Sequence, residues 1–232
     1  MMDQSHQSYQ SHLSHPKLKR QKMITSPWLN VDLYDYEGHM ATPGVGQSAL
    51  LADEFARAIQ SARPQSIGLM GCAGGNGLDA LVGGEMTHVV CVDINSSYLA
   101  SLSERYKDKI GGLEIICGEV ELFKSKQPLD LIFGGLIFEY TRLEEALTAL
   151  AGSLRVGGML VALIQIKNNG ITTVSSSPYA HTLTEVGIAF SYIDPDRMSA
   201  VAAACGLDEL TRREETLASG KSFTIIQYVK TA

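Results

Sequence analysis

The chain has 232 residues, which is enough for one α/β-sized domain with a substantial core. Hydrophobic residues make up 45% of it and charged residues 19%, so a wholly disordered chain is excluded. Asp and Glu number 25 against 19 Lys and Arg, and the resulting net charge of -6 argues against nucleic acid as a partner.

Targeting and redox features are sparse. Residues 1–25 are rich in Ser, Gln and His and contain no apolar stretch of signal-peptide length, so we expect them to form a disordered tail. The longest uncharged apolar stretch, residues 156–166, is well short of the ~20 residues of a membrane-spanning helix. Four cysteines are widely spaced and form no CxxC pair, so neither a metal site nor a disulfide is expected. We expect a cytoplasmic protein with no membrane partner.

Strands and helices alternate along the remaining chain. The predicted strands are continuously apolar, as in a parallel sheet that crossover helices cover on both faces. The last two apolar runs bracket a Gly-containing turn and predict an antiparallel hairpin. Strands are predicted at 66–70, 88–92, 113–117, 129–133, 159–166, 210–216 and 222–229, and helices over 47–61, 78–81, 96–106, 143–154 and 195–205, with Ser96 or Ser97 near an N-cap and a loop over 167–192. The pattern predicts a doubly wound, mostly parallel, seven-stranded α/β sheet.

A glycine cluster, Gly71-Cys-Ala-Gly-Gly-Asn-Gly77, follows the first predicted strand directly. Such a turn lets a ligand approach the backbone, and the positive end of a following helix favours a polar ligand there. The dinucleotide fingerprint G-x-G-x-x-G would need glycine at positions 73 and 76, where the chain has Ala73 and Asn76. A permitted variant beginning at Gly75 starts about one turn too late. The loop therefore predicts a small polar ligand, with only a weak dinucleotide signal.

Acidic residues follow the next two predicted strands. Asp93 stands where a carboxylate can accept hydrogen bonds from two vicinal ribose hydroxyls, and the alternative is that it only caps the next helix. Glu119 and Glu121 come after the third strand, where a carboxylate can accept from an adenine amino group. The alternative for these two is a solvated acid at a helix N-terminus. Taken with the glycine loop, Asp93 favours a nucleoside ligand.

At these residues the chain resembles the class I S-adenosylmethionine-dependent methyltransferase family. The similar segments are GCAGGNGL (71–78), CVDIN (91–95), CGEVE (117–121), LDLIFGGLIFEY (129–140) and LRVGGMLVAL (154–163), and the last helix and hairpin over 194–230 are similar as well. The resemblance implies an enzyme that uses S-adenosylmethionine to methylate a small-molecule acceptor by in-line transfer. It also implies roles in the cofactor site for Gly71, Cys72, Ala73 and Gly75 (methionine part), Asp93 (ribose), Ile94, Glu119 and Val120 (adenine), and Gly134.

The resemblance places a cap over the cofactor at residues 34–40. It makes Tyr36, Tyr140 and His181 candidate contacts of the acceptor. Many small-molecule members carry a His where Glu139 and Tyr140 stand here, so no general base is carried over. Candidate bases near the mouth of the site are His39, Tyr140, Glu139 and His181, of which His39 and Tyr140 are kept as weak candidates.

The same resemblance organises the chain into one domain over residues 26–232. Its expected parts are an N-terminal cap and helix (26–62), a cofactor-binding core (63–166), a substrate lid (167–192), and the last helix with the hairpin (193–232). Two other functions stay open: a non-catalytic regulatory domain that binds S-adenosylmethionine, and a nicotinamide-dependent oxidoreductase. The sequence indicates neither the acceptor atom nor the oligomeric state.

Overall fold

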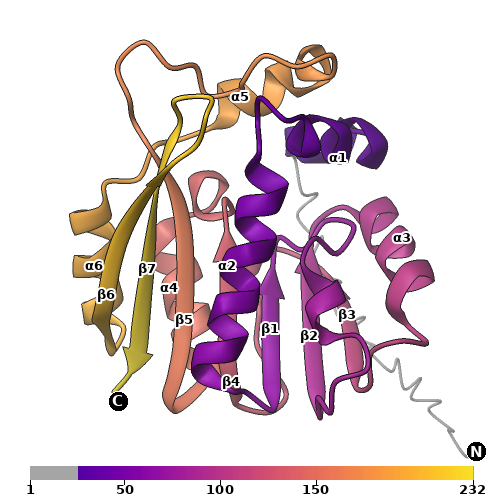
Figure 1. Cartoon of the computed structure of the whole chain (residues 1–232). Helices are drawn as coiled ribbons and strands as arrows, with labels where there is room; N and C mark the ends of the chain where they lie inside the picture. Colours follow the sequence, from indigo (N-terminus) through magenta and orange to yellow (C-terminus); the bar gives the residue numbers. More distant parts are fainter. Residues whose placement is uncertain (1–25, 232) are drawn as a thin grey trace, which may run out of the picture.

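The computed structural model describes residues 26–231, so the predicted tail lies outside the described residues. A seven-stranded sheet with the order β3-β2-β1-β4-β5-β7-β6 forms its centre (Figure 1). All neighbouring pairs from β3 to β5 are parallel, and β7 runs antiparallel to both β5 and β6. The predicted doubly wound sheet with its terminal hairpin is confirmed. The strands are β1 (Ser66–Met70), β2 (His88–Asp93), β3 (Leu113–Cys117), β4 (Leu129–Gly135), β5 (Leu154–Ile166), β6 (Leu207–Thr216) and β7 (Ser222–Lys230).

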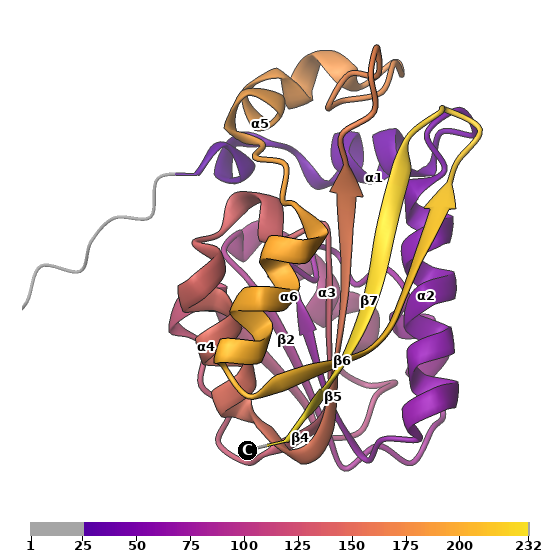
Figure 2. The same ribbon diagram turned by 90° about the vertical axis from the view of Figure 1, so that its left-hand side faces the viewer.

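Four helices cover the two faces of the sheet. Helices α2 (Gln47–Ala62) and α3 (Ser96–Tyr106) pack on one face, and α4 (Leu143–Ser153) and α6 (Pro195–Ala204) on the other. Figure 2 shows α2 on one side of the sheet and α4 and α6 on the opposite side. No helix within residues 26–231 has both the length and the apolar composition that crossing a membrane requires.

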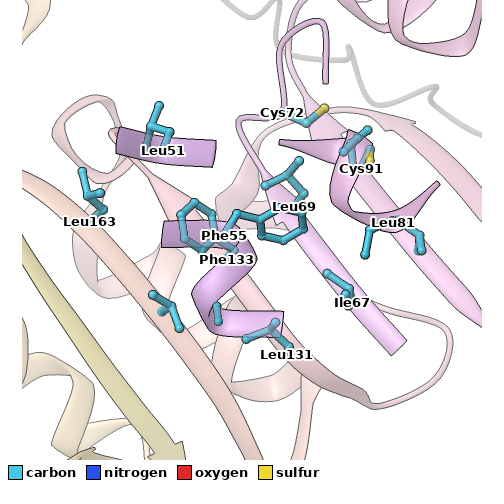
Figure 3. Packing of buried hydrophobic residues seen from close by; sticks show 14 of the residues in the cluster. Leu51, Phe55, Ile67, Leu69, Cys72, Leu81, Cys91, Leu131, Phe133 and Leu163 are labelled. Carbon is cyan, nitrogen blue, oxygen red and sulfur yellow. The ribbon is translucent and has the colours of Figure 1, made fainter. Parts of the chain in front are cut away.

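Alternate side chains along each strand point to opposite faces of the sheet, and both faces are packed. Ile67 and Leu69 of β1 pack under α2, whereas Met70 packs with the opposite cluster. Figure 3 shows the first cluster, in which the rings of Phe55 and Phe133 lie 5.3 Å apart between centroids. Both faces are therefore buried, which is why these strands read as continuous apolar runs.

Short helices form a roof over the carboxyl ends of the strands. These are η1 (Pro27–Asn30), α1 (Leu33–Ala41), η5 (Ala180–Leu183) and α5 (Thr184–Ala189) (Figure 1). The sequence predicts a loop over residues 167–192, but they contain η5 and α5, which are too short to produce a helical period in the sequence. The roof brings the amino-terminal segment and the β5–α6 connection together above the sheet.

Three local predictions need correction. The N-cap of α3 is Asn95, not Ser96 or Ser97, because its side chain accepts hydrogen bonds from the amides of Ser97 and Tyr98. The predicted helix at 78–81 is a single 3-10 turn, η2 (Leu78–Leu81), with two glycines closely following it at 83 and 84. Strand β5 begins at Leu154, directly after α4, and not at residue 159.

Candidate functional site

A cavity of about 470 Å³ lies between the roof and the carboxyl ends of the parallel strands. Open α/β sheets bind their ligands at this edge, because the loops after the strands converge there. Each of the first four strands contributes residues to its wall. These are Gly71 and Ala73 after β1, Asp93 and Ile94 at the end of β2, Gly118, Glu119 and Val120 after β3, and Gly135 with Leu136 and Ile137 at the end of β4.

The glycine loop is fastened to β2 and bends sharply. The amides of Gly71 and Cys72 donate to the Val92 carbonyl at 2.8 and 3.2 Å. Gly71 has a φ of +65°, and a Cβ at this position would lie 3.0 Å from the Ile137 side chain. Ala73 also has a positive φ, +44°, which an L-residue adopts at a cost of about 1–2 kcal/mol. Such strain persists only where surrounding contacts hold the residue, and here Asp93 provides one.

Asp93 joins the glycine loop to the end of β2. Its Oδ2 accepts from the Ala73 amide at 2.9 Å, and its Oδ1 accepts from the Asn95 amide at 2.9 Å. Burial raises the pKa of the Asp93 carboxyl, and the Asn95 and Ala73 amides partly oppose that shift. The two amides hold the side chain in place, and each carboxylate oxygen can still accept a further hydrogen bond from a ligand. Asn95 performs the capping of α3, so Asp93 is free for another role.

Two acids and a short helix line the neighbouring part of the cavity. Val120 is the first residue of η3 (Val120–Leu122), where its amide has no carbonyl partner within the helix. Glu119 borders the cavity 3.9 Å from the Arg142 guanidinium. Glu121 Oε1 accepts from the Arg142 amide at 3.0 Å, so this carboxylate anchors the start of α4. Ile94 supplies an apolar wall beside these groups.

Aromatic side chains close the cavity from the roof. The Trp28 ring meets Tyr36 and Tyr140 edge-on, with centroids 5.5 and 5.3 Å away. The Asn95 side-chain amide donates to the Trp28 carbonyl at 2.9 Å, which ties η1 to the start of α3. Burial raises the pKa of the Tyr140 hydroxyl far above its usual value, and the Glu139 charge adds to the shift. Tyr140 is therefore neutral and a poor general base.

One acidic and one basic residue, Glu139 and Lys221, are buried in the cavity wall. Glu139 is 1% exposed, and its Oε1 accepts from the Gln165 amide at 2.7 Å. Burial raises the Glu139 pKa to about 7, even though that amide bond favours the charged form. Lys221 is 2% exposed and donates to the Thr173 carbonyl. Burial lowers the Lys221 pKa to about 8.

His39 of α1 also lines the cavity, but its lowered pKa makes it a weak base. Its Nδ1 lies 2.8 Å from the Ser177 hydroxyl. Burial, with a smaller contribution from the charge of Lys221, lowers the His39 pKa to about 4. The imidazole is therefore neutral and weakly basic near pH 7, and Glu139 has the pKa better matched to accepting a proton.

Three predicted cofactor residues lie outside the cavity. Cys72 is buried beneath the loop, where burial raises its thiol pKa. A Cβ on Gly75 would lie 2.7 Å from the Tyr106 ring, and one on Gly134 would lie 2.9 Å from Phe138. These positions serve close packing under the site, and the cavity wall is formed by their neighbours.

The roof differs from the prediction at three residues. His181, a predicted acceptor contact, is exposed, and its Nδ1 lies 3.2 Å from the Pro178 carbonyl instead of in the cavity. Trp28 and Lys221 line the cavity and were not predicted. Trp28 is the chain's single tryptophan, which could have marked it, whereas a lysine beside a turn glycine carries no such signal.

Comparisons with known proteins agree with this geometry. A family model described as a methyltransferase domain matches residues 69–162. The chain has the fold of the N-methyltransferase NodS from Bradyrhizobium japonicum WM9 in complex with S-adenosyl-L-homocysteine, with 13% identity, a TM-score of 0.62 and coverage of 86% of this chain and 99% of that one. Magnesium protoporphyrin IX methyltransferase from Synechocystis PCC 6803 with bound S-adenosylhomocysteine is similar too, with 12% identity, a TM-score of 0.60 and coverage of 81% and 84%. No curated protein matches the sequence significantly.

The fold by itself does not fix the reaction. The [4+2]-cyclase SpnF has the same fold with a TM-score of 0.64 at 10% identity, over 84% of this chain and 87% of that one. The domain match is more specific, because it covers the glycine loop, Asp93, β3 and β4 together. Residues 69–162 therefore match a methyltransferase domain, and the strand order and the cavity at the carboxyl edge agree with that match.

Proposed function

We propose that this protein transfers a methyl group from S-adenosylmethionine to a small-molecule acceptor. The observation that carries the proposal is the pairing of the Asp93 carboxylate with the Ala73 amide at the wall of the cavity. This pairing brings a carboxylate that can accept hydrogen bonds from ribose hydroxyls next to the accessible backbone of the glycine loop, at one ligand site. A nucleoside with an extended polar tail fits such a site.

The residues that follow β1, β2 and β3 match the methionine, ribose and adenine parts of the cofactor in that order. Gly71 and Ala73 leave backbone accessible for the methionine part, and Asp93 has acceptor capacity for both ribose hydroxyls. Ile94 offers an apolar contact for adenine, and Glu119 with the Val120 amide offers an acceptor and a donor for its edge. Because β1, β2 and β3 are adjacent in the sheet, these groups follow one another across it.

When bound, S-adenosylmethionine supplies a methyl group on a positively charged sulfur that becomes neutral on transfer. The protein's task is then to align the acceptor and exclude water, which accounts for much of the barrier reduction in such reactions. Trp28, Tyr36 and Tyr140 supply the dry wall for this alignment. The cavity of about 470 Å³ would hold the acceptor together with the cofactor, and this limited space favours a small acceptor.

Two measurements test this function. Calorimetry should show that the protein binds S-adenosylhomocysteine and not NAD, and incubation with methyl-tritiated S-adenosylmethionine should label a member of a small-molecule acceptor pool. Binding of NAD in place of S-adenosylhomocysteine would favour the oxidoreductase alternative. Binding of S-adenosylhomocysteine without transfer to any acceptor would favour the regulatory alternative.

A further inference from the structure

We propose that the methyl acceptor is a small zwitterion whose ammonium group binds Glu139 and whose anionic group binds Lys221. The inference rests on the proposed function and deepens it by naming the class of acceptor. It is based on one acidic and one basic side chain, Glu139 and Lys221, that are buried in the same cavity and form no ion pair with each other.

Neither charge is neutralised within the described part of the chain. Glu139 Oε2 has no hydrogen-bond partner among residues 26–231, and Oε1 has only the Gln165 amide. Lys221 bonds to the Thr173 carbonyl and forms no ion pair with any residue in the same range. Burying an ionisable group without a counter-charge is costly, and groups perturbed in this way cluster at functional sites. A ligand that carries both signs would complete both sites at once.

The sheet order places these charges on the acceptor side of the cavity. The cofactor groups follow β1, β2 and β3, whereas Glu139 follows β4 and bonds to Gln165 on β5. Lys221 directly precedes β7, which is three strands from β1, or about 14 Å at the usual strand spacing. The cofactor and the two charges therefore occupy opposite halves of the sheet edge.

The two side chains are held on separate walls. Glu139 is fixed to the backbone of β5, and Lys221 is fixed to the connection that follows β5 in the roof. Gln165, His39 and Tyr140 line the cavity with them and are uncharged near pH 7, whereas the other charged side chains of the cavity, Asp93, Glu119, Glu121 and Arg142, lie at the ends of β2 and β3 and at the start of α4. A ligand can therefore span from one charge to the other, with neutral side chains lining the space.

The first test uses ligands of defined charge and no variant. The probes are the unbranched ω-amino acids from glycine to 6-aminohexanoate, titrated calorimetrically into protein saturated with S-adenosylhomocysteine. For each length, the alkylamine and the alkanoate are the matched single-charge controls. The proposal predicts that at least one ω-amino acid binds about tenfold or more tightly than both of its controls. If no member of the series binds, or if none exceeds its controls, the proposal is overturned.

The second test assigns each charge to its residue. Glu139→Gln should abolish the advantage of the ω-amino acid over the alkanoate, and Lys221→Met should abolish its advantage over the alkylamine. Glu185→Gln and Lys167→Met are matched controls, because both side chains are exposed and outside the cavity. A purely structural role for either residue would weaken all three ligands equally, which would overturn the assignment.

Cofactor affinity separates this proposal from the one on which it rests. Glu139→Gln and Lys221→Met should leave the affinity for S-adenosylhomocysteine within about twofold of wild type. If either variant weakens it as much as a change at Asp93 does, the charge holds the cofactor and the zwitterion proposal fails. If the wild-type protein does not bind S-adenosylhomocysteine at all, the proposed function itself fails.

Discussion

Replacing Asp93 with Asn should weaken cofactor binding strongly while preserving the size of the side chain. The carboxylate already accepts one amide bond on each oxygen, from Ala73 and Asn95. The side-chain amide introduced by Asp93→Asn would turn its NH₂ group towards one of those N–H donors, and it would carry no charge for the ribose hydroxyls. The variant therefore disturbs both the ligand contact and the support of the glycine loop.

The magnitude follows from the number of charge-assisted bonds. A hydrogen bond to a charged group contributes about 1.5–3 kcal/mol, and Asn retains one neutral acceptor. The net loss for two ribose hydroxyls is then about 2–4 kcal/mol, or roughly 30- to 700-fold in the dissociation constant. Calorimetric titration with S-adenosylhomocysteine measures this change directly. A loss below about threefold in a folded variant would refute the ribose assignment.

Asp130 offers a matched control at the opposite edge of the sheet. It also accepts backbone bonds at a strand end, from the Gln65 and Ser66 amides at 2.9 Å each. Asp130→Asn should lower stability and leave affinity for S-adenosylhomocysteine within about twofold of wild type. Equal loss of affinity in both variants would mean that the Asp93 effect comes from general destabilisation.

Three further predictions concern the loop, the sheet edge and the roof. Gly71→Ala should lower the unfolding free energy, measured by urea titration, by about 1–2 kcal/mol, because the φ of Gly71 is +65° and the new methyl group would meet Ile137. An unchanged unfolding free energy would contradict the positive φ at this position. Burial would raise the pKa of Asp130, but its guanidinium and amide partners outweigh that effect and lower it to about 2. The ionised Asp130 carboxylate should add about 2 kcal/mol to the unfolding free energy above pH 4, and this contribution should be lost as the pH falls towards 2. In urea titrations, Asp130→Asn should make the unfolding free energy less dependent on pH over that range. Lys221→Met should raise the His39 pKa in an NMR titration, and an unchanged value would show that the two side chains do not interact.

The sheet was predictable because its strands are buried on both faces. Runs such as 88–92 and 129–133 are mostly apolar, and the strands lie within a few residues of those bounds. The position of Asp93 in the site was predictable for a related reason, since parallel strands end at a common edge. What the sequence could not indicate was the bond between Asp93 and the Ala73 amide, which depends on the path of the loop.

The roof was less predictable because tertiary contacts decide it. Helix α5 has six residues, too few to show a helical period, and Lys221 follows a glycine in a hairpin, where lysine is ordinarily solvated. Its burial comes from the chain around Thr173, which is distant in sequence. His181 shows the opposite case, because a plausible residue type in the lid segment lies on the surface.

One cofactor molecule is expected to span the glycine loop and the Asp93 carboxylate. A crystal structure of the protein with S-adenosylhomocysteine tests it most directly. We expect density for the ribose hydroxyls against both Asp93 oxygens, for adenine beside Ile94 and Val120, and for the sulfur on the side of the cavity that faces Tyr140. Density that places the ribose away from Asp93, or the nucleoside outside this cavity, would contradict it.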